Sequence, residues 1–111
     1  MTGPAHITQA ESVILGALWR CGPLTPARLQ TEVKAVQPWA DTTIKTLLAR
    51  LIHKRIVRPE RHEGVLRYRP LIERAAYVDA EVQEVLDRLF DGDPAALVAF
   101  LQRDRTADGR G

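Results

Sequence analysis

The stretch WADTTIKTLLARLIHKR, residues 39–55, constrains the fold more than any other part of this sequence. Its apolar residues recur at spacings of three and four, which predicts a helix with one buried face. The buried set is Ile44, Leu47, Leu48, Leu51 and Ile52. The opposite face, from Thr42 to Lys54, combines short hydroxyl side chains with long cations and holds no acidic side chain. We therefore expect a helix over residues 42–54, capped by Asp41, with a core-facing side and a cationic outer side.

Two shorter helices are predicted before it. Thr8 and Glu11 have the spacing of a capping box at the start of the first helix, and the CGP that follows contains residues that end helices. Thr25 and Pro26 are residue types typical of the N-cap and the first position of a second helix. Three helices joined by short turns are thus expected to open the fold.

A β-hairpin is predicted next. IVRPER and VLRYRP are short β-prone runs on either side of HEG. Pro59 lacks a backbone donor, which favours an edge position for the first run. Arg67 and Arg69 alternate with apolar side chains in the second run, so one side of the hairpin is expected to pack while the other carries positive charge.

A long helix over about residues 73–90 and a last short helix after DGDP complete the pattern. We therefore predict a mainly α protein: a winged helix-turn-helix, with three helices and a hairpin wing, followed by C-terminal dimerisation helices. The predicted domains are a winged-helix DNA-binding domain at 1–70, a helical dimerisation region at 71–104 and a flexible tail at 105–111.

The last helices carry apolar positions in a coiled-coil-like arrangement. We expect them to be buried against a second copy of the chain, although some could instead pack back on the winged domain. The positions are Val78, Val82, Val85, Leu86, Leu89, Phe90, Leu97, Phe100 and Leu101.

The formal net charge of +2 conceals an uneven distribution. Residues 1–44 are balanced, residues 45–70 hold eight basic and two acidic side chains, and residues 71–111 hold nine acidic and five basic ones. A basic block followed by an acidic one indicates that the first binds a polyanion.

The cationic helix face suits duplex DNA, because a helix fits the major groove and short side chains allow close approach to base edges. The residues nearest the helix start are expected to contact bases, and these are Thr42, Thr43, Lys45 and Thr46. Other side chains are better suited to phosphates, which position the protein without reading sequence, and these are Trp39, Arg50, Lys54, Arg67 and Arg69. The sequence thus predicts a protein that binds double-stranded DNA through this helix face and the hairpin.

Other function classes have less support. There is no glycine-rich phosphate loop, no paired carboxylates in an apolar setting and no nucleophile beside a base, so we expect no enzyme, metal or cofactor. His53 and His62 read as surface residues, and Cys21 alone cannot form an internal disulfide. The absence of a signal sequence or an apolar membrane span predicts a cytoplasmic, nucleoid-associated protein. The alternative is a winged-helix module that binds protein, whose affinity would be insensitive to salt.

Several motifs occur together in order: ITQAE with LW, GPLT, TTIKTLLARLIHK after Trp39, YRP, and LFDGDPAALVAFL. From Ile7 to Leu101 the sequence resembles the penicillinase-repressor family of bacterial transcription regulators. The resemblance implies a dimeric winged-helix repressor of pseudo-palindromic operators, with the last helices forming the dimer interface. It places the four residues assigned to bases at the family's base-contacting positions, and Arg50 and the wing arginines at backbone-contacting positions.

Several positions depart from the family pattern, among them Ser12, Ala40 and Leu66, and two further departures bear on the turn into the hairpin and on cleavage. Arg55 replaces the usual glycine entering the wing, which leaves two alternatives: a strained bend at Arg55, or a turn that needs no positive φ. Ala99–Phe100 stands where the antibiotic-regulated members have an Asn–Phe bond, which a membrane metalloprotease sensor cuts. That sensor is a further partner implied by the resemblance, but with the asparagine replaced we do not expect cleavage here.

Overall fold

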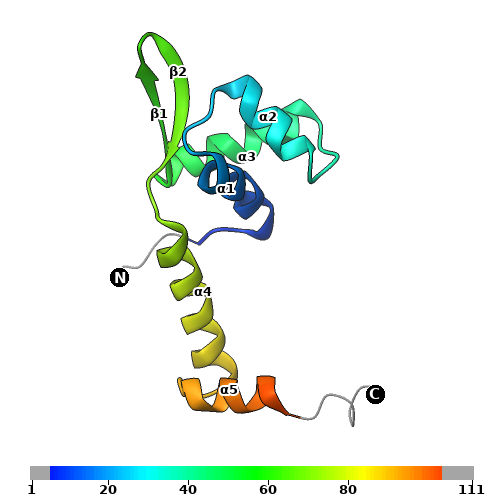
Figure 1. Ribbon diagram of the computed structural model, residues 1–111, viewed down its shortest axis with the longest axis vertical. Coiled ribbons are helices and arrows are strands. Elements are labelled where there is room, and N and C mark those ends of the chain that lie inside the picture. The colour runs from blue at the N-terminus through cyan, green and yellow to red at the C-terminus, as the bar shows by residue number, and fades with distance from the viewer. Residues whose placement is uncertain (1–5, 104–111) are drawn as a thin grey trace. The chain divides into compact units, whose positions relative to one another are not determined.

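The computed structural model describes residues 6–103. The protein is mainly helical with one two-stranded antiparallel hairpin, which confirms the predicted fold class. The elements in chain order are α1 Gln9–Cys21, α2 Pro26–Lys34, α3 Asp41–His53, β1 Val57–His62, β2 Val65–Pro70, α4 Arg74–Leu89 and α5 Pro94–Gln102 (Figure 1). They form two compact units, the first ending at Arg74 and the second beginning at Ala75. The predicted tail, residues 105–111, lies outside the described residues.

Local sequence signals explain the first two helix starts. At α1 the Thr8 hydroxyl accepts from the Glu11 N–H at 3.1 Å, and a Glu11 carboxylate oxygen accepts from the Thr8 N–H at 3.0 Å. This reciprocal pair satisfies two backbone donors that the helix cannot. At α2 the Thr25 hydroxyl accepts from the Arg28 N–H at 3.2 Å, with Pro26 at the first helical position. Both predicted caps are confirmed.

The predicted cap of α3 is wrong. Ala40 occupies the N-cap and makes no side-chain cap, while Asp41 is the first helical residue. The Asp41 carboxylate instead pairs with the Lys34 ammonium at the end of α2. A carboxylate in the first turn still favours the helix through its dipole, so Asp41 contributes by charge rather than by capping.

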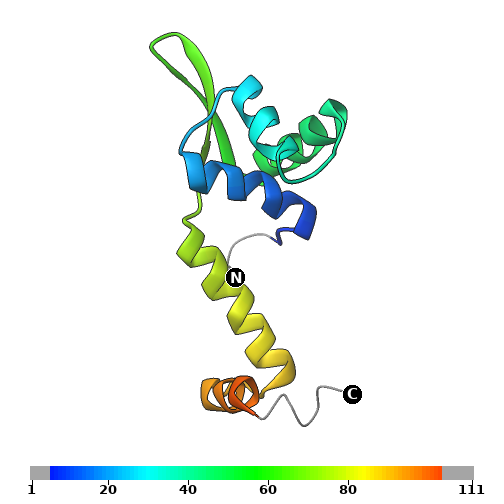
Figure 2. The ribbon, with the colours of Figure 1, turned by 45° about the vertical axis from the view of Figure 1, so that its right-hand side comes forward.

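The core of the first unit lies among α1, α2 and α3, and the start of β1 closes one side (Figures 1 and 2). Four of the five predicted core positions of the 39–55 stretch are buried, while Ile52 is only half-buried. The core residues from these elements are Ile14, Leu15, Ala17, Leu18, Leu29, Val33, Ile44, Leu47, Leu48, Leu51 and Val57. Burying the apolar stripe of α3 leaves its other face outside the fold.

The turn from α3 into β1 decides between the two alternatives at Arg55. Arg55 has φ +64°, so the bend does adopt the left-handed conformation. The Ile56 N–H donates to the Leu51 carbonyl and the Arg55 N–H to the Ile52 carbonyl, both at 2.9 Å. These are the two hydrogen bonds of a Schellman motif, in which glycine is the usual left-handed residue. Arg55 therefore holds a strained backbone in a turn that the helix end requires.

The hairpin forms as predicted, with β1 and β2 antiparallel. Its turn consists of Glu63 and Gly64, both with positive φ, which matches the right-handed twist of the two strands. This two-residue turn fixes the register, in which Glu60 lies opposite Arg67. Leu24 and Tyr68 exchange backbone hydrogen bonds that attach β2 to the segment before α2.

The second unit consists of α4 and α5, with α5 crossing the end of α4 (Figures 1 and 2). Asp93 caps α5 by accepting from the Ala95 N–H at 2.9 Å. The Phe90 and Phe100 rings meet edge to face with centroids 5.8 Å apart, and the Arg103 guanidinium lies 3.8 Å from the Phe100 ring centre. Among the described residues, no helix combines the length and apolar composition needed to cross a bilayer.

Candidate DNA-binding surface

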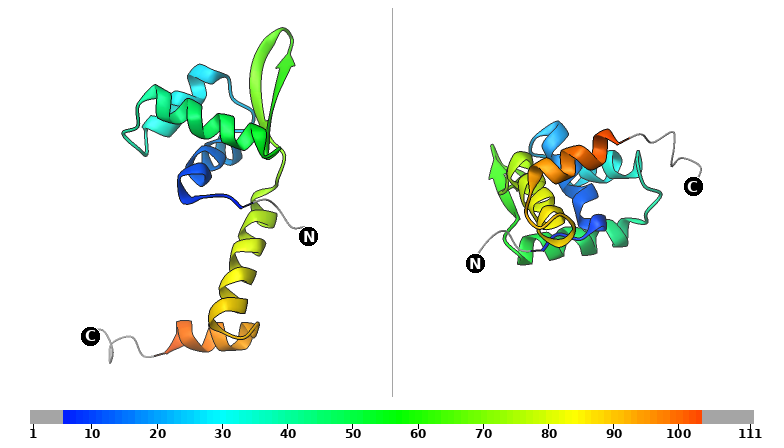
Figure 3. Two further views of the ribbon diagram at one scale, coloured as in Figure 1. Left: turned by 180° about the vertical axis from the view of Figure 1, so that it is seen from behind. Right: turned by 90° about the horizontal axis from the view of Figure 1, so that it is seen from below.

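The outer face of α3 is open to solvent. In the view from behind, α3 lies in front of α1 and α2 (Figure 3, left). The side chains at Thr42, Thr43, Lys45, Thr46 and Arg50 are all exposed. Four of them, with Leu47, line a shallow depression of about 260 Å³ that contains no carboxylate. Hydroxyls, methyl groups and a guanidinium thus share one concave patch on a rigid helix.

This patch has the chemistry that base reading requires. Threonine hydroxyls can donate to or accept from either base type, and their methyl groups can contact thymine methyls. Lys45 lies one helical turn from Asp41, whose charge the Lys34 ammonium already pairs. The acid-free face predicted from the sequence is therefore present at the exposed side of α3.

Trp39 lies in the connection between α2 and α3 and is half-buried. Its backbone N–H donates to the Gln37 carbonyl at 2.8 Å, which holds the connection in a tight turn directly before α3. Trp39 does not line the depression on α3.

Lys54 does not line the depression on α3, and it makes an ion pair that the sequence did not predict. Its ammonium lies 2.7 Å from Oε1 of Glu11 and 2.9 Å from the His6 carbonyl. The Glu11 side chain is 1% exposed, so the lysine is the counter-ion of a buried carboxylate. Sequence reasoning used Glu11 only as a capping residue, although a buried carboxylate at a helix start also requires a cation.

The environment of Glu11 keeps it ionised. Burial raises the pKa of its carboxyl, but the hydrogen bond and charge of Lys54 and the hydrogen bonds of Thr8 lower it by more, so the net pKa is below the usual value. α1 and the end of α3 are thus joined by a charged pair.

The wing arginines are partly neutralised by one carboxylate. Arg69 Nε lies 3.0 Å from each Glu60 oxygen, and its terminal NH2 nitrogen lies 2.9 Å from Oε2. Arg67 is further away, with its NH2 nitrogen 3.8 Å from Oε2. The hydrogen bond from Arg69, with the charges of Arg69, Arg67 and Arg58, holds the pKa of Glu60 below its usual value despite an opposing effect of burial. Glu60 was counted as a charge in the sequence analysis, but this contact was not predicted.

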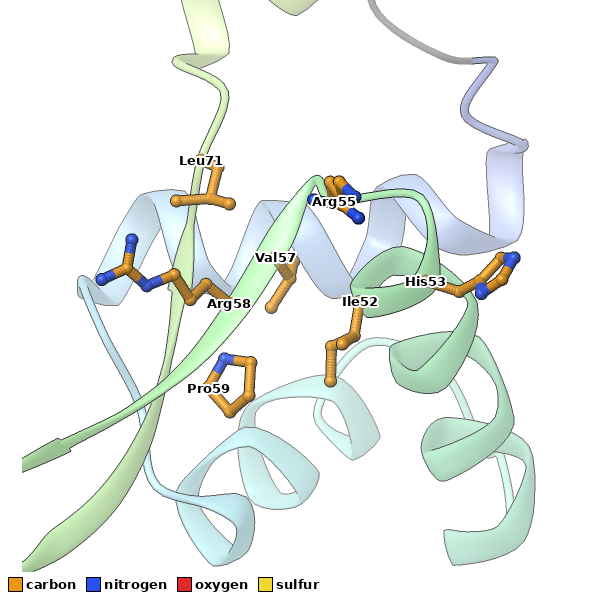
Figure 4. A pocket seen from close by; sticks show the side chains of 7 residues that line it. All are labelled: Ile52, His53, Arg55, Val57, Arg58, Pro59 and Leu71. Carbon is orange, nitrogen blue, oxygen red and sulfur yellow. The ribbon is translucent and has the colours of Figure 1, made fainter.

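A second hollow, of about 540 Å³, lies at the end of α3 beside β1 (Figure 4). Ile52, Val57, Pro59 and Leu71 contribute apolar side chains. Its other lining residues are the basic or titratable His53, Arg55 and Arg58. His53 is exposed here, as expected for a surface residue. The hollow contains neither a carboxylate nor a nucleophile, and residues 6–103 hold no cluster of three potential metal ligands.

The positions predicted for dimerisation fall into different environments. Leu86 is buried within a single chain, so it is not available to a partner, contrary to expectation. Phe90 packs against Phe100, which keeps 45% of its surface exposed. Leu89 and Leu101 are 60% and 54% exposed. Val82 is also exposed, while the remaining positions are half-buried, namely Val78, Val85 and Leu97.

Comparison with known proteins now identifies the scaffold. The family model described as penicillinase repressor matches residues 7–110. The chain belongs to the penicillinase repressor family. The penicillinase repressor of Bacillus licheniformis is 26% identical over 101 residues, which cover 90% of this chain and 79% of the relative. That of Staphylococcus aureus is 25% identical over 93 residues, covering 84% and 74%.

Two solved structures match this family member, and each covers 69% of the chain at 26% identity. One is the solution structure of the DNA-binding domain of the repressor BlaI, with a TM-score of 0.59 and 94% of that chain covered. The other is monomeric Bacillus licheniformis BlaI in complex with the blaP half-operator, with a TM-score of 0.62 and the same coverage. The predicted function, a DNA-binding transcriptional repressor rather than an enzyme, is thereby confirmed.

Proposed function

We propose that this penicillinase-family repressor binds a two-fold symmetric operator as a homodimer, with the first half of α3 in the major groove of each half-site. The observation that carries the proposal is the exposed, acid-free patch of three threonines, Lys45 and Arg50 on α3. The related BlaI monomer was solved on a half-operator, which supports the same use of the winged domain here.

Individual roles follow from side-chain chemistry. Thr42, Thr43, Lys45 and Thr46 contact base edges. A second set contacts phosphates: Arg50 at the edge of the patch, Trp39 through its indole N–H, and the wing residues Arg67 and Arg69. The first set supplies sequence discrimination, and the second supplies most of the affinity and its salt dependence.

Dimerisation is supported by the exposed apolar side chains of the second unit. Leu89, Phe100 and Leu101 together leave a large apolar area in water for so short a segment. Burying each leucine fully contributes about 2 kcal/mol, so a few residues from each chain can sustain association. A two-fold axis then places two recognition helices about one DNA turn apart.

Sensor cleavage is not part of the proposal. The Ala99–Phe100 bond lies inside α5, and the Phe100 ring packs on Phe90. A protease would have to unwind this helix before cutting.

A mobility-shift titration with the protein's own promoter DNA tests the proposal. With about six phosphate contacts, log K should fall with log salt at a slope near −5. Thr46→Val removes a hydroxyl but keeps the shape, and should reduce the preference for operator over scrambled DNA about fivefold. Thr31→Val is the matched control, because the Thr31 hydroxyl already donates to the Ala27 carbonyl within α2. Salt-insensitive binding, or equal loss on both DNAs, would contradict the proposed mode.

A further inference from the structure

We propose that Glu60 attenuates DNA binding: its carboxylate occupies the wing guanidinium groups, and operator phosphates must displace it. The inference rests on the proposed contact between the wing and the DNA backbone. It assigns to one acidic side chain the control of how tightly that contact forms.

The hairpin register gathers these groups on one face. Glu60 lies opposite Arg67, and Arg58 opposite Arg69. Because alternate residues of a strand point to the same side, all four side chains share one face of the hairpin. Three arginines thus surround a single carboxylate on the surface proposed to meet phosphates.

One carboxylate cannot satisfy all of these donors. Arg69 takes both oxygens of Glu60 within hydrogen-bond distance. Arg67 approaches only to 3.8 Å, beyond a hydrogen bond, and its Nε is buried without a hydrogen-bond partner among the described residues. A phosphate has the oxygens that a guanidinium binds, so it can accept from the terminal nitrogen of Arg67 that Glu60 does not reach within hydrogen-bond distance.

The Glu60–Arg69 ion pair competes with DNA phosphates for the guanidinium, yet a phosphate can replace the carboxylate. Arg69 is 46% exposed, and ion pairs of such exposure contribute little to stability, so Arg69 can exchange partners without unfolding the hairpin. While Glu60 holds it, however, an incoming phosphate meets a nearby negative charge and an occupied guanidinium. Removing the charge of Glu60 should therefore strengthen binding.

The test compares Glu60→Gln with Glu63→Gln. Both remove one negative charge from the same hairpin, but Glu63 is at the turn, where its carboxylate lies 3.8 Å from His62 Nε2 rather than beside an arginine. Glu60→Gln should raise affinity for promoter DNA about tenfold and steepen the slope of log K against log salt by about 2, as one further phosphate contact in each of the two subunits does. Glu63→Gln should change affinity less than threefold. Both proteins are checked for unchanged thermal unfolding.

A double variant distinguishes two causes of tighter DNA binding, the release of Arg69 from Glu60 and the loss of the negative charge of Glu60. In an Arg69→Ala background, Glu60→Gln should give clearly less than its tenfold gain, because the released side chain is absent. Equal effects of the two glutamine variants, or weaker binding by Glu60→Gln, would overturn the inference while leaving DNA binding intact. If the unmodified protein fails to bind promoter DNA, the proposed function itself fails, which is a distinct result.

Discussion

The Lys54 ammonium at the end of α3 lies 2.7 Å from a carboxylate oxygen of Glu11, a side chain that is 1% exposed at the start of α1. The same oxygen accepts from the Thr8 N–H at 3.0 Å, so one carboxylate both caps α1 and binds the end of α3. A contact between residues 43 positions apart thus joins the first helix to the proposed recognition helix.

Lys54→Met should destabilise the protein by about 3 kcal/mol, because it leaves the Glu11 charge buried and unpaired. Urea unfolding measures the change. Lys34→Met is the matched control: it removes a lysine that pairs with exposed Asp41, and should destabilise the protein far less than Lys54→Met does. The double variant Glu11→Gln, Lys54→Met should recover much of the loss. Strictly additive single effects would contradict the pairing.

The same pair predicts a pH dependence. Because the folded-state pKa of Glu11 is lowered from its usual value of 4.5, its contribution to stability is fully present above that pH. It is lost as the pH falls through the lower folded-state pKa. Unfolding free energies measured from pH 7 to pH 2 should therefore decline below about pH 4.5, and the decline should be shallower in Glu11→Gln. If the unfolding free energy of Glu11→Gln declined at low pH as steeply as that of the unmodified protein, Glu11 would be excluded as a contributor to the pH dependence.

Arg55→Gly should stabilise the fold by about 0.5–1 kcal/mol. Glycine adopts positive φ without the steric cost that Arg55 bears at +64°, and this gain exceeds the entropy that glycine adds to the unfolded chain. Arg55→Ala is the control, since it removes the same side chain but keeps the strained conformation. Equal stability of the glycine and alanine variants in thermal unfolding would show that the backbone is not strained.

Much of the fold was predictable because its signals are local. The capping pairs at Thr8 and Thr25 act over three residues, and the apolar stripe of α3 repeats within one helix. The two strands of the hairpin were predicted, but which residues lie opposite one another depends on the length of the turn. Once Glu63 and Gly64 are taken as a two-residue turn, the opposition of Glu60 and Arg67 follows, so this contact could have been found from sequence.

Contacts between distant segments were not predictable in the same way. Nothing near Lys54 in the sequence indicates that its cation turns inward to Glu11, because the pairing depends on how α1 packs on α3. The periodicity of α4 likewise marks Leu86 as apolar without showing that it is buried in one chain. The exposed threonine face was predicted correctly because it is simply the side of α3 opposite the core.

Leu89→Asp should yield a monomer and weaken operator binding about 100-fold, because the second recognition helix is no longer tethered. Leu89 is 60% exposed, so the charge disturbs association rather than folding. Sedimentation at micromolar concentration measures the oligomeric state. Ala76→Asp adds the same charge at an exposed position on another side of α4 and should leave the dimer intact.

Leu86→Asp should behave differently. Because Leu86 is buried within the chain, the variant should lose helix content in circular dichroism as well as association. A monomeric unmodified protein at micromolar concentration, or a dimeric Leu89→Asp variant, would contradict this assignment of the interface.

The Trp19 indole N–H donates to the Ile72 carbonyl at 2.9 Å, which attaches the segment after the hairpin to α1. The chain has two tryptophans, and the other, Trp39, precedes α3. A single Trp39→Phe change therefore leaves Trp19 as the only tryptophan. Its fluorescence then reports whether the segment after β2 remains in contact with α1. The molecule thus contains its own optical probe of that junction, and no attached dye is needed.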